Sequence, residues 1–372
     1  MTPKTLSCEA LLRALHLRDL TDPEQGAHAM QQLVSDIRTA LTERWRCTCR
    51  IERSSPIVPV ADNYDRLGYP PEGASRDARY TRYLSDHLML RSQMSAVIPG
   101  ALRALVPTPP GDLLLVCPGL VYRRDVIDRL HVGEPHQLDL WRVTRKALTG
   151  DDLLVMIAVV VETALPGAHY RTRPASHPYT RAGLEIEARV GDEWVEIGEC
   201  GLAAPEVLAG AGLGGCTGLA MGLGLDRLLM LRKGIDDIRL LRSDDPRVTA
   251  QMEDLEAWRP VSNQPPTRRD LSVAVSEATD PETLGDQVRE AMGETVDWVE
   301  GIEWLDETPY DELPPQARER MGMHPGLKNV LLRITLRHPT RTLTSDEANR
   351  LRDTLYAAIH AGSRHEWARP QG

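Results

Sequence analysis

Residues 119–139 read Gly119-Leu-Val-Tyr-Arg-Arg-Asp-Val-Ile-Asp-Arg-Leu-His-Val-Gly-Glu-Pro-His-Gln-Leu-Asp139. Two apolar runs, residues 113–116 and 138–143, flank this stretch and predict strands. The pattern therefore predicts a strand, a charged loop and a returning strand. Adjacent arginines at the end of a strand can bind a phosphate in a bidentate manner, and the carboxylates opposite could hold a metal or an ammonium group. A solvated hairpin tip of mixed charge is the alternative interpretation of this segment taken alone.

Length and composition bound the class of protein. At 372 residues the chain can form two or three domains. No apolar run is long enough to span a bilayer, and the N-terminus follows neither a signal-peptide nor a transit-peptide pattern. We therefore expect a cytoplasmic protein. The net charge of −10 argues against nonspecific polyanion binding by the chain as a whole, but leaves room for a local basic site.

Six cysteines are scattered along the chain, and Cys47 and Cys49 form the only close pair. Zinc sites need a second pair or histidines at ligand spacing, which are missing here, so we expect free thiols.

Periodicity predicts the elements of the first 260 residues. Apolar residues at helical spacing predict helices at residues 27–44, 84–105 and 151–165. Alternating apolar residues predict strands at residues 184–190 and 194–200, joined by a turn.

A glycine-rich run follows at residues 210–224. Gly210, Gly212 and Gly215 match a G-X-G-X-X-G pattern, but no predicted strand leads directly into it and no P-loop lysine follows. A dinucleotide site is therefore disfavoured. We expect these glycines to let a strand pass close to a ligand.

A proline-rich linker at residues 260–266 separates the first 260 residues from a C-terminal region with a different order of predicted elements. The remaining residues predict the order strand, helix, strand, strand, helix, either with or without a final strand, which is typical of a small ferredoxin-like sandwich. Arg333 and Arg337 alternate with apolar residues and are expected on one outer strand face, where they are either a basic stripe with Arg341 or a solvated surface.

Three segments together resemble a known family. Val121–Asp125 with His136–Asp139, Trp194–Gly201, and Gly218–Arg227 followed by residues 234–240 resemble class II aminoacyl-tRNA synthetases, in particular the catalytic subunit of the phenylalanyl-tRNA synthetases. Residues 268–344 resemble the ferredoxin-fold anticodon-binding domain that ends the bacterial partner subunit and the single-chain organellar enzyme.

The resemblance implies an α+β fold: a class II antiparallel sheet flanked by helices, followed by a small βαββαβ domain. We expect a catalytic domain at residues 1–258, with an N-terminal extension of about 50 residues, and an anticodon-binding-like domain at residues 266–362. The arrangement is similar to the single-chain organellar form, with no fused beta subunit.

The resemblance also implies an ATP site. Arg123 matches the arginine that holds the α-phosphate, and Arg227 matches the one at the γ-phosphate. These cations would stabilise the charge that builds at phosphorus. Asp125 and Glu196 match acidic positions near ATP and Mg²⁺, with Glu196 as the metal ligand, and His131 could reach a phosphate.

The amino acid site is implied in the same way. Gln137 and Asp139 match the pair that binds the α-amino group, and Ser95 matches a serine of the same wall, although Gln93 replaces a histidine there. Ala220 matches the small residue at the pocket floor.

Five departures fall where the family commonly has phenylalanine, and Met221 and Leu241 are two of them. Pro135 stands at the adenine-facing position, and His177 and Tyr179 stand at two aromatic walls of the substrate pocket. Because polar groups discriminate against ligands that leave them unpaired, the hypothesis is that the substrate is phenylalanine or a relative with a polar ring.

Three functions remain open from the sequence. The first is activation of this amino acid and its transfer to tRNA(Phe); the second is activation for a non-tRNA acceptor; the third is a noncatalytic amino acid sensor. Residues 265–372 contain 13 Lys and Arg against 19 Asp and Glu, which is awkward for a tRNA-binding domain. The chain contains no phenylalanine, which suits a protein translated when charged phenylalanyl-tRNA is scarce. Monomer and homodimer are both compatible with the sequence.

Overall fold

The computed structural model describes residues 5–77, 80–261, 265–338 and 341–364. The chain divides into two compact units. Unit 1 comprises Met1–Arg123, Glu134–Leu241 and Thr249–Arg259; unit 2 comprises Arg124–Gly133, Arg242–Val248 and Pro260–Gly372. In the described ranges, no helix is both long enough and apolar enough to cross a membrane.

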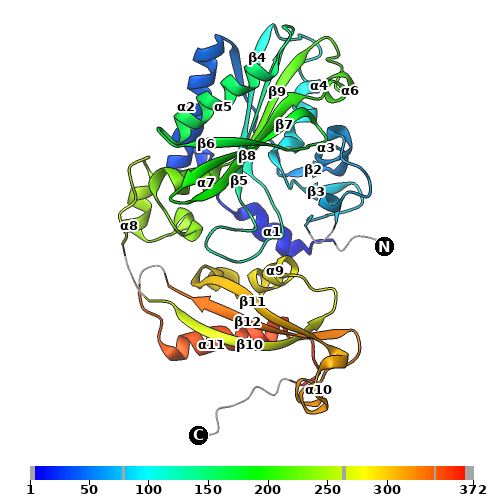
Figure 1. Ribbon diagram of the computed structural model, residues 1–372, viewed down its shortest axis with the longest axis vertical. Helices are drawn as coiled ribbons and strands as arrows, with labels where there is room; N and C mark the ends of the chain where they lie inside the picture. The colour runs from blue at the N-terminus through cyan, green and yellow to red at the C-terminus, as the bar shows by residue number, and fades with distance from the viewer. Residues whose placement is uncertain (1–4, 78–79, 262–264, 339–340, 365–372) are drawn as a thin grey trace. The chain divides into compact units, whose positions relative to one another are not determined.

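Unit 1 is built on a seven-stranded sheet with the order β1-β4-β5-β9-β8-β7-β6 (Figure 1). Every neighbouring pair is antiparallel except β1 and β4. The strands are β1 (Thr48–Ile51), β4 (Asp112–Leu120), β5 (His136–Thr144), β6 (Tyr170–Pro174), β7 (Thr180–Val190), β8 (Glu193–Ala203) and β9 (Thr217–Gly224). The antiparallel sheet confirms the predicted fold class.

Helices cover both faces of this sheet. The helices α2 (Ala29–Trp45) and α5 (Gly150–Ala164) pack against each other on one side (Figure 1). A capping box between Thr149 and Asp152 begins α5 and satisfies its first backbone donors. The shorter helices of unit 1 are α1 (Cys8–His16), α3 (Val60–Asn63), α4 (Ile98–Arg103), α6 (Pro205–Gly210) and α7 (Leu225–Lys233). The helix α8 (Pro246–Thr249) begins in the segment Arg242–Val248, which belongs to unit 2.

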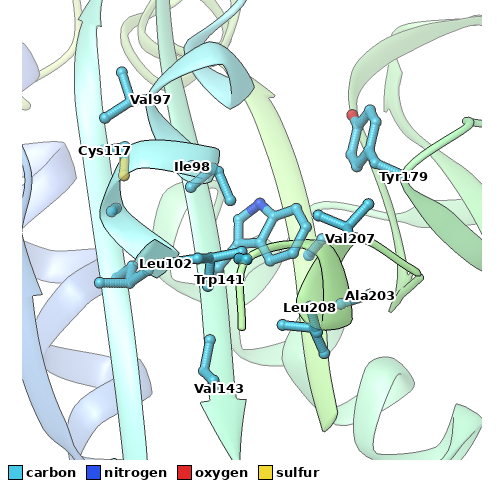
Figure 2. Packing of buried hydrophobic residues seen from close by; sticks show 14 of the residues in the cluster. Val97, Ile98, Leu102, Cys117, Trp141, Val143, Tyr179, Ala203, Val207 and Leu208 are labelled. Atoms are coloured by element: carbon cyan, nitrogen blue, oxygen red, sulfur yellow. The ribbon is translucent and has the colours of Figure 1, made fainter. Parts of the chain in front are cut away.

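The opposite face carries a core centred on Trp141, whose side chain is fully buried. Figure 2 shows its indole between Ile98 and Leu102 of α4 and Val207 and Leu208 of α6. Each Å² of apolar surface that such packing removes from water stabilises the folded state by roughly 25 cal/mol. This packing fixes β5, which carries the candidate site residues.

The predicted helix at residues 84–105 is wrong over its first half. There the chain forms β3 (Leu88–Leu90), which pairs with β2 (Ile57–Pro59), and the helical part begins only at Met94. Short apolar runs fit both periods, and the pairing of Leu90 with Ile57, far apart in sequence, decides for a strand.

Unit 2 contains an antiparallel sheet of order β10-β12-β11. Its strands are β10 (Thr267–Ser276), β11 (Val299–Pro309) and β12 (Leu327–Leu336), and its helices are α9 (Pro281–Met292), α10 (Pro315–Met321) and α11 (Ser345–Ile359). Apolar residues of the sheet, α9 and α11 form one core. The predicted final strand of a βαββαβ domain does not occur up to Arg364, where the described residues end. Instead, Ala361 donates a single backbone hydrogen bond of 2.7 Å to Ala274 on β10.

The loop at residues 124–133 groups with unit 2. Ile127 is buried in the core of that unit, and its carbonyl accepts a hydrogen bond from the backbone nitrogen of Ile302 at 2.9 Å. Arg289 on α9 donates to the carbonyls of Asp125 and Val126 at 2.5 and 2.6 Å. The buried side chain of Ile127 and the hydrogen bonds to the backbone carbonyls of the loop thus hold the loop within unit 2.

Candidate active site

On one face of the unit 1 sheet, β5 carries polar side chains and the neighbouring strand β9 carries only small residues. Residues directly opposite in an antiparallel pair lie on the same face. Four positions of β5 face four positions of β9, in the pairs Gln137–Gly224, Asp139–Gly222, Trp141–Ala220 and Val143–Gly218. Every residue that β9 places on this face is glycine or alanine. The predicted floor residue Ala220 thus belongs to a face of β9 on which every residue is small.

Asp139 is the most unusual group on this face. Its side chain is almost fully buried, with 2% of the residue exposed, and Oδ1 has no hydrogen-bond partner within the described part of the chain. Burial raises the pKa of this carboxyl to about 7. A hydrogen bond from Ser95 to Oδ2 and the indole of Trp141, whose buried Nε1 likewise makes no hydrogen bond among the described residues, oppose the shift. A buried carboxylate oxygen without a partner is costly, so this site is built for a cationic or hydrogen-bonding ligand.

Gln137 and Ser95, which were also expected at the amino acid site, lie beside Asp139. The Oε1 atom of Gln137 accepts a hydrogen bond from the backbone nitrogen of Met94 at 3.1 Å, which fixes the amide. Gln93, which precedes this turn, accepts a hydrogen bond from the Tyr69 hydroxyl at 3.0 Å and donates to the carbonyl of Asn63 at 2.9 Å. The polar wall is therefore held by its own hydrogen bonds.

Arg123 is oriented from two sides. Its Nε donates to the carbonyl of Ser92 at 2.8 Å, and its own carbonyl accepts a hydrogen bond from Arg82 at 2.9 Å. Within the described residues its terminal Nη groups make no hydrogen bond, so a planar pair of donors stays available for an anion.

Arg227 and Glu196, two residues predicted at the ATP site, lie next to each other. Arg227 lies in the first turn of α7 and donates to the carbonyl of Glu196 at 2.8 Å, while the carboxylate of Glu196 is 3.9 Å away. A register shift in β8 near Ile197 places Glu196 opposite Glu187 and Glu199 opposite Glu185. This bulge puts two acidic side chains three residues apart on one face.

His177 and Tyr179 both contact Glu199, a residue that the sequence did not single out. His177 Nε2 pairs with one oxygen of the Glu199 carboxylate, and the Tyr179 hydroxyl donates to the other at 3.0 Å. Hydrogen bonding to Glu199 raises the pKa of His177. Burial alone would raise the pKa of Glu199, but the bonds from His177 and Tyr179 bring it below its usual value.

Three predicted ATP-site residues lie in or near the hairpin loop. Asp125 and His131 belong to unit 2, where the Asp125 carboxylate accepts a hydrogen bond from the backbone of Val126 and His131 contacts Asp128 at 2.8 Å. Pro135 belongs to unit 1, and its carbonyl accepts a hydrogen bond from Val121 at 2.9 Å. The other predicted residues all lie in unit 1.

Sequence reasoning missed Trp141, Tyr69 and Glu199. The ring of Tyr179 lies 6.2 Å from that of Trp141 and 6.3 Å from that of Tyr69, so the three form an aromatic wall. A signal existed for Trp141, because it follows Asp139 by two residues in a strand and so shares its face. Glu199 gave no such signal, since the bulge before it changes the alternation.

No cluster of three or more potential metal ligands occurs among the described residues. Glu196 alone is an exposed carboxylate on this face, with 52% of its side chain accessible. Mg²⁺ bound through phosphates takes one or two protein carboxylates, so this donor set fits such an ion.

The fold and the site define a class of protein. The profile of the family described as "tRNA synthetases class II core domain (F)" matches residues 16–252, so the chain belongs to this family. This match confirms the resemblance to the class II enzymes, which use ATP as a substrate.

Three individual relatives within this family are all named as phenylalanine–tRNA ligases or their alpha subunits. The chain is 28% identical to the chloroplastic/mitochondrial phenylalanine–tRNA ligase of Arabidopsis thaliana over 320 residues, which cover 82% of this chain and 70% of the relative. It is 26% identical to the probable mitochondrial phenylalanine–tRNA ligase of Drosophila melanogaster, covering 82% and 76%. It is 34% identical to the phenylalanine–tRNA ligase alpha subunit of Prochlorococcus marinus, but covers only 56% of that subunit.

Proposed function

We propose that this protein activates phenylalanine or a phenylalanine-like amino acid with ATP and transfers it to tRNA(Phe). The observation that carries the proposal is the buried Asp139 carboxylate, with one oxygen unpartnered, on the sheet of a class II synthetase. The names of the relatives support the choice of amino acid and acceptor.

The amino group of the substrate would bind at Asp139. An ammonium ion supplies the donor that Oδ1 lacks, and its charge favours the ionised carboxylate. The Gln137 amide lies on the same face two residues away. These contacts would hold the substrate carboxylate in position for attack.

The first reaction step forms an acyl–phosphate bond. A carboxylate oxygen of the amino acid attacks the α-phosphorus of ATP, and the bond to the β-phosphate oxygen breaks, releasing pyrophosphate. Arg123, fixed by Ser92, would stabilise the charge on the α-phosphate, and Arg227 would bind the γ-phosphate.

A magnesium ion would be held by Glu196 and the phosphates of ATP. When bound, such an ion neutralises phosphate charge and orients the leaving group. Burial raises the pKa of Glu196 above its ordinary value, and the neighbouring Arg227 opposes this rise.

In the second step, a terminal hydroxyl of tRNA attacks the acyl carbon and AMP leaves. We assign recognition of the tRNA to residues 266–362 as an anticodon-binding-like domain, following residues 1–258 as the catalytic domain. The three-stranded sheet with α9 and α11 on one face supports this assignment.

Amino-acid-dependent exchange of pyrophosphate into ATP tests the activation step. We expect exchange with phenylalanine or a ring-substituted relative and none with aliphatic amino acids. Exchange that depends only on an unrelated amino acid, or no exchange with any, would contradict the proposal.

A further inference from the structure

Two carboxylates face each other across an open strip of the unit 1 sheet. Asp139 on β5 and Glu199 on β8 are both register partners of Gly222 on the strand between them. All three residues therefore lie on one face. A Cβ placed on Gly222 would meet only the Cγ of Glu199, at 4.0 Å, so the space above this glycine is open.

Neighbouring strands lie about 4.8 Å apart. The backbones of Asp139 and Glu199 are therefore separated by roughly two such spacings. An aromatic amino acid carries its amino group and a ring substituent at opposite ends. If its amino group were bound at Asp139, its ring would lie over Gly222 and its far edge would face Glu199.

The end of the strip at Glu199 is polar and preorganised. His177 Nε2 and the Tyr179 hydroxyl hold the two oxygens of the Glu199 carboxylate. The side chain of Glu199 remains 35% exposed, while that of His177 is only 14% exposed. Each carboxylate oxygen has two lone pairs, so Glu199 can accept another hydrogen bond.

An unsubstituted phenyl ring fits this end poorly. A phenyl ring has no hydrogen-bond donor. If such a ring covered Glu199, the carboxylate would lose its hydrogen bonds to water and gain none in return. A ring hydroxyl or amino group replaces that water with a charge-assisted hydrogen bond. The aromatic wall of Trp141 and Tyr179 offers contact to either ring.

We propose that Glu199 determines the specificity of the proposed activation reaction, and that the preferred substrate is an aromatic amino acid carrying a hydroxyl or amino group on its ring. This inference rests on the proposed function. Glu199, held by His177 and Tyr179, accepts the hydrogen bond from the ring substituent, while Asp139 binds the amino group.

Pyrophosphate exchange with the full chain tests this inference. The substrates are phenylalanine, para-tyrosine, meta-tyrosine and 4-aminophenylalanine, each measured as kcat/KM. One hydrogen bond to a charged group corresponds to a preference of about 10- to 100-fold, so we expect at least one donor-bearing substrate to exceed phenylalanine by that factor. Preference for phenylalanine over all three would overturn the inference, whatever the variants do.

Variants then connect the preference to Glu199. We expect Glu199→Ala to remove most of the preference while activity with phenylalanine persists, and Glu199→Gln to retain part of it. Glu185→Ala is the matched control, because it removes the carboxylate opposite Glu199 on β7. A preference unchanged in Glu199→Ala overturns the inference. Absence of exchange with all four substrates in the wild type contradicts the proposed function instead.

Discussion

At the scale of single residues, Asp139 determines whether the site binds an amino acid. Its position in β5 and its pairing with Gln137 followed from the motif, whereas its burial and its unpartnered oxygen required the fold. Nothing in a one-letter pattern shows that Ser95 binds one oxygen and leaves the other without a partner.

Asp139→Asn tests the role of this charge. The amide keeps the shape of the side chain but loses the charge that attracts an ammonium group. We expect KM for the amino acid in pyrophosphate exchange to rise by about 10- to 100-fold, with KM for ATP changed little. Glu185→Gln serves as the control for a general charge effect. An unchanged KM for the amino acid would contradict the assignment.

The pH dependence of amino acid binding follows from the same carboxyl. Because its pKa is about 7 in the free protein, Asp139 is protonated below pH 7 and then attracts an ammonium group weakly. We expect KM for the amino acid to fall as the pH rises from 6 to 8, and this trend to disappear in Asp139→Asn. The same trend in the variant would point to another group.

Stability should show the opposite pH trend. The folded pKa of Asp139, about 7, exceeds the ordinary value of 3.8, so the folded state binds this proton more tightly than the unfolded state. This contribution to stability is fully present below pH 4 and is lost as the pH rises to about 7, by up to roughly 4 kcal/mol. We expect the free energy of unfolding of Asp139→Asn, measured with urea, to fall less between pH 4 and 7 than that of the wild type. Equal pH dependence in both proteins would contradict the buried, raised pKa.

At the scale of elements, β9 shows what periodicity can and cannot predict. The glycine run was expected to let a strand pass close to a ligand, and residues 217–224 do form a strand. Its two kinds of glycine could not be told apart from sequence. A Cβ on Gly218 would lie 2.7 Å from the carbonyl oxygen of Arg142, whereas Gly222 faces open space. Only the register with neighbouring strands distinguishes them.

The pair Gly222→Ala and Gly218→Ala tests this distinction. We expect Gly222→Ala to keep the stability of the wild type but to raise KM for the amino acid about tenfold or more, since a methyl group enters the open strip. Gly218→Ala should lower the free energy of unfolding by about 1–3 kcal/mol through overpacking. Thermal unfolding and pyrophosphate exchange separate the two effects. Equal losses of stability in both variants would argue that the strip is merely structural.

At the scale of the whole molecule, the sequence predicted a catalytic domain, a smaller C-terminal domain and a family resemblance for both. It did not predict which part of the chain holds the loop at residues 124–133. Its grouping with unit 2 depends on Arg289 and Ile302, which lie more than 150 residues further along the chain. Contacts of this kind leave no local periodicity. The excess of acidic residues in residues 265–372 can be counted in the sequence, but the pairing of individual arginines with these carboxylates requires the structure.

The arginines of the outer face in unit 2 are paired with carboxylates. Arg333 lies between Asp270 and Glu303 in the register and binds Asp270 at 2.9 Å, and Arg341 binds Glu347 at 2.7 Å. Two acidic neighbours disfavour phosphate at Arg333. We therefore expect Arg333→Gln to leave KM for tRNA within about twofold of the wild type and to leave the salt dependence of charging unchanged. A clear rise in KM for tRNA, with exchange intact, would restore the basic-stripe hypothesis.

Charging of purified tRNA(Phe) is the most direct test of the central claim. The assay uses the full chain and the amino acid that gives the strongest pyrophosphate exchange, beside a tRNA of another specificity. We predict aminoacylation of tRNA(Phe) alone, and its loss in Arg123→Ala. Exchange without charging of tRNA(Phe) would contradict the claim and favour a non-tRNA acceptor, and neither activity would indicate an amino acid sensor.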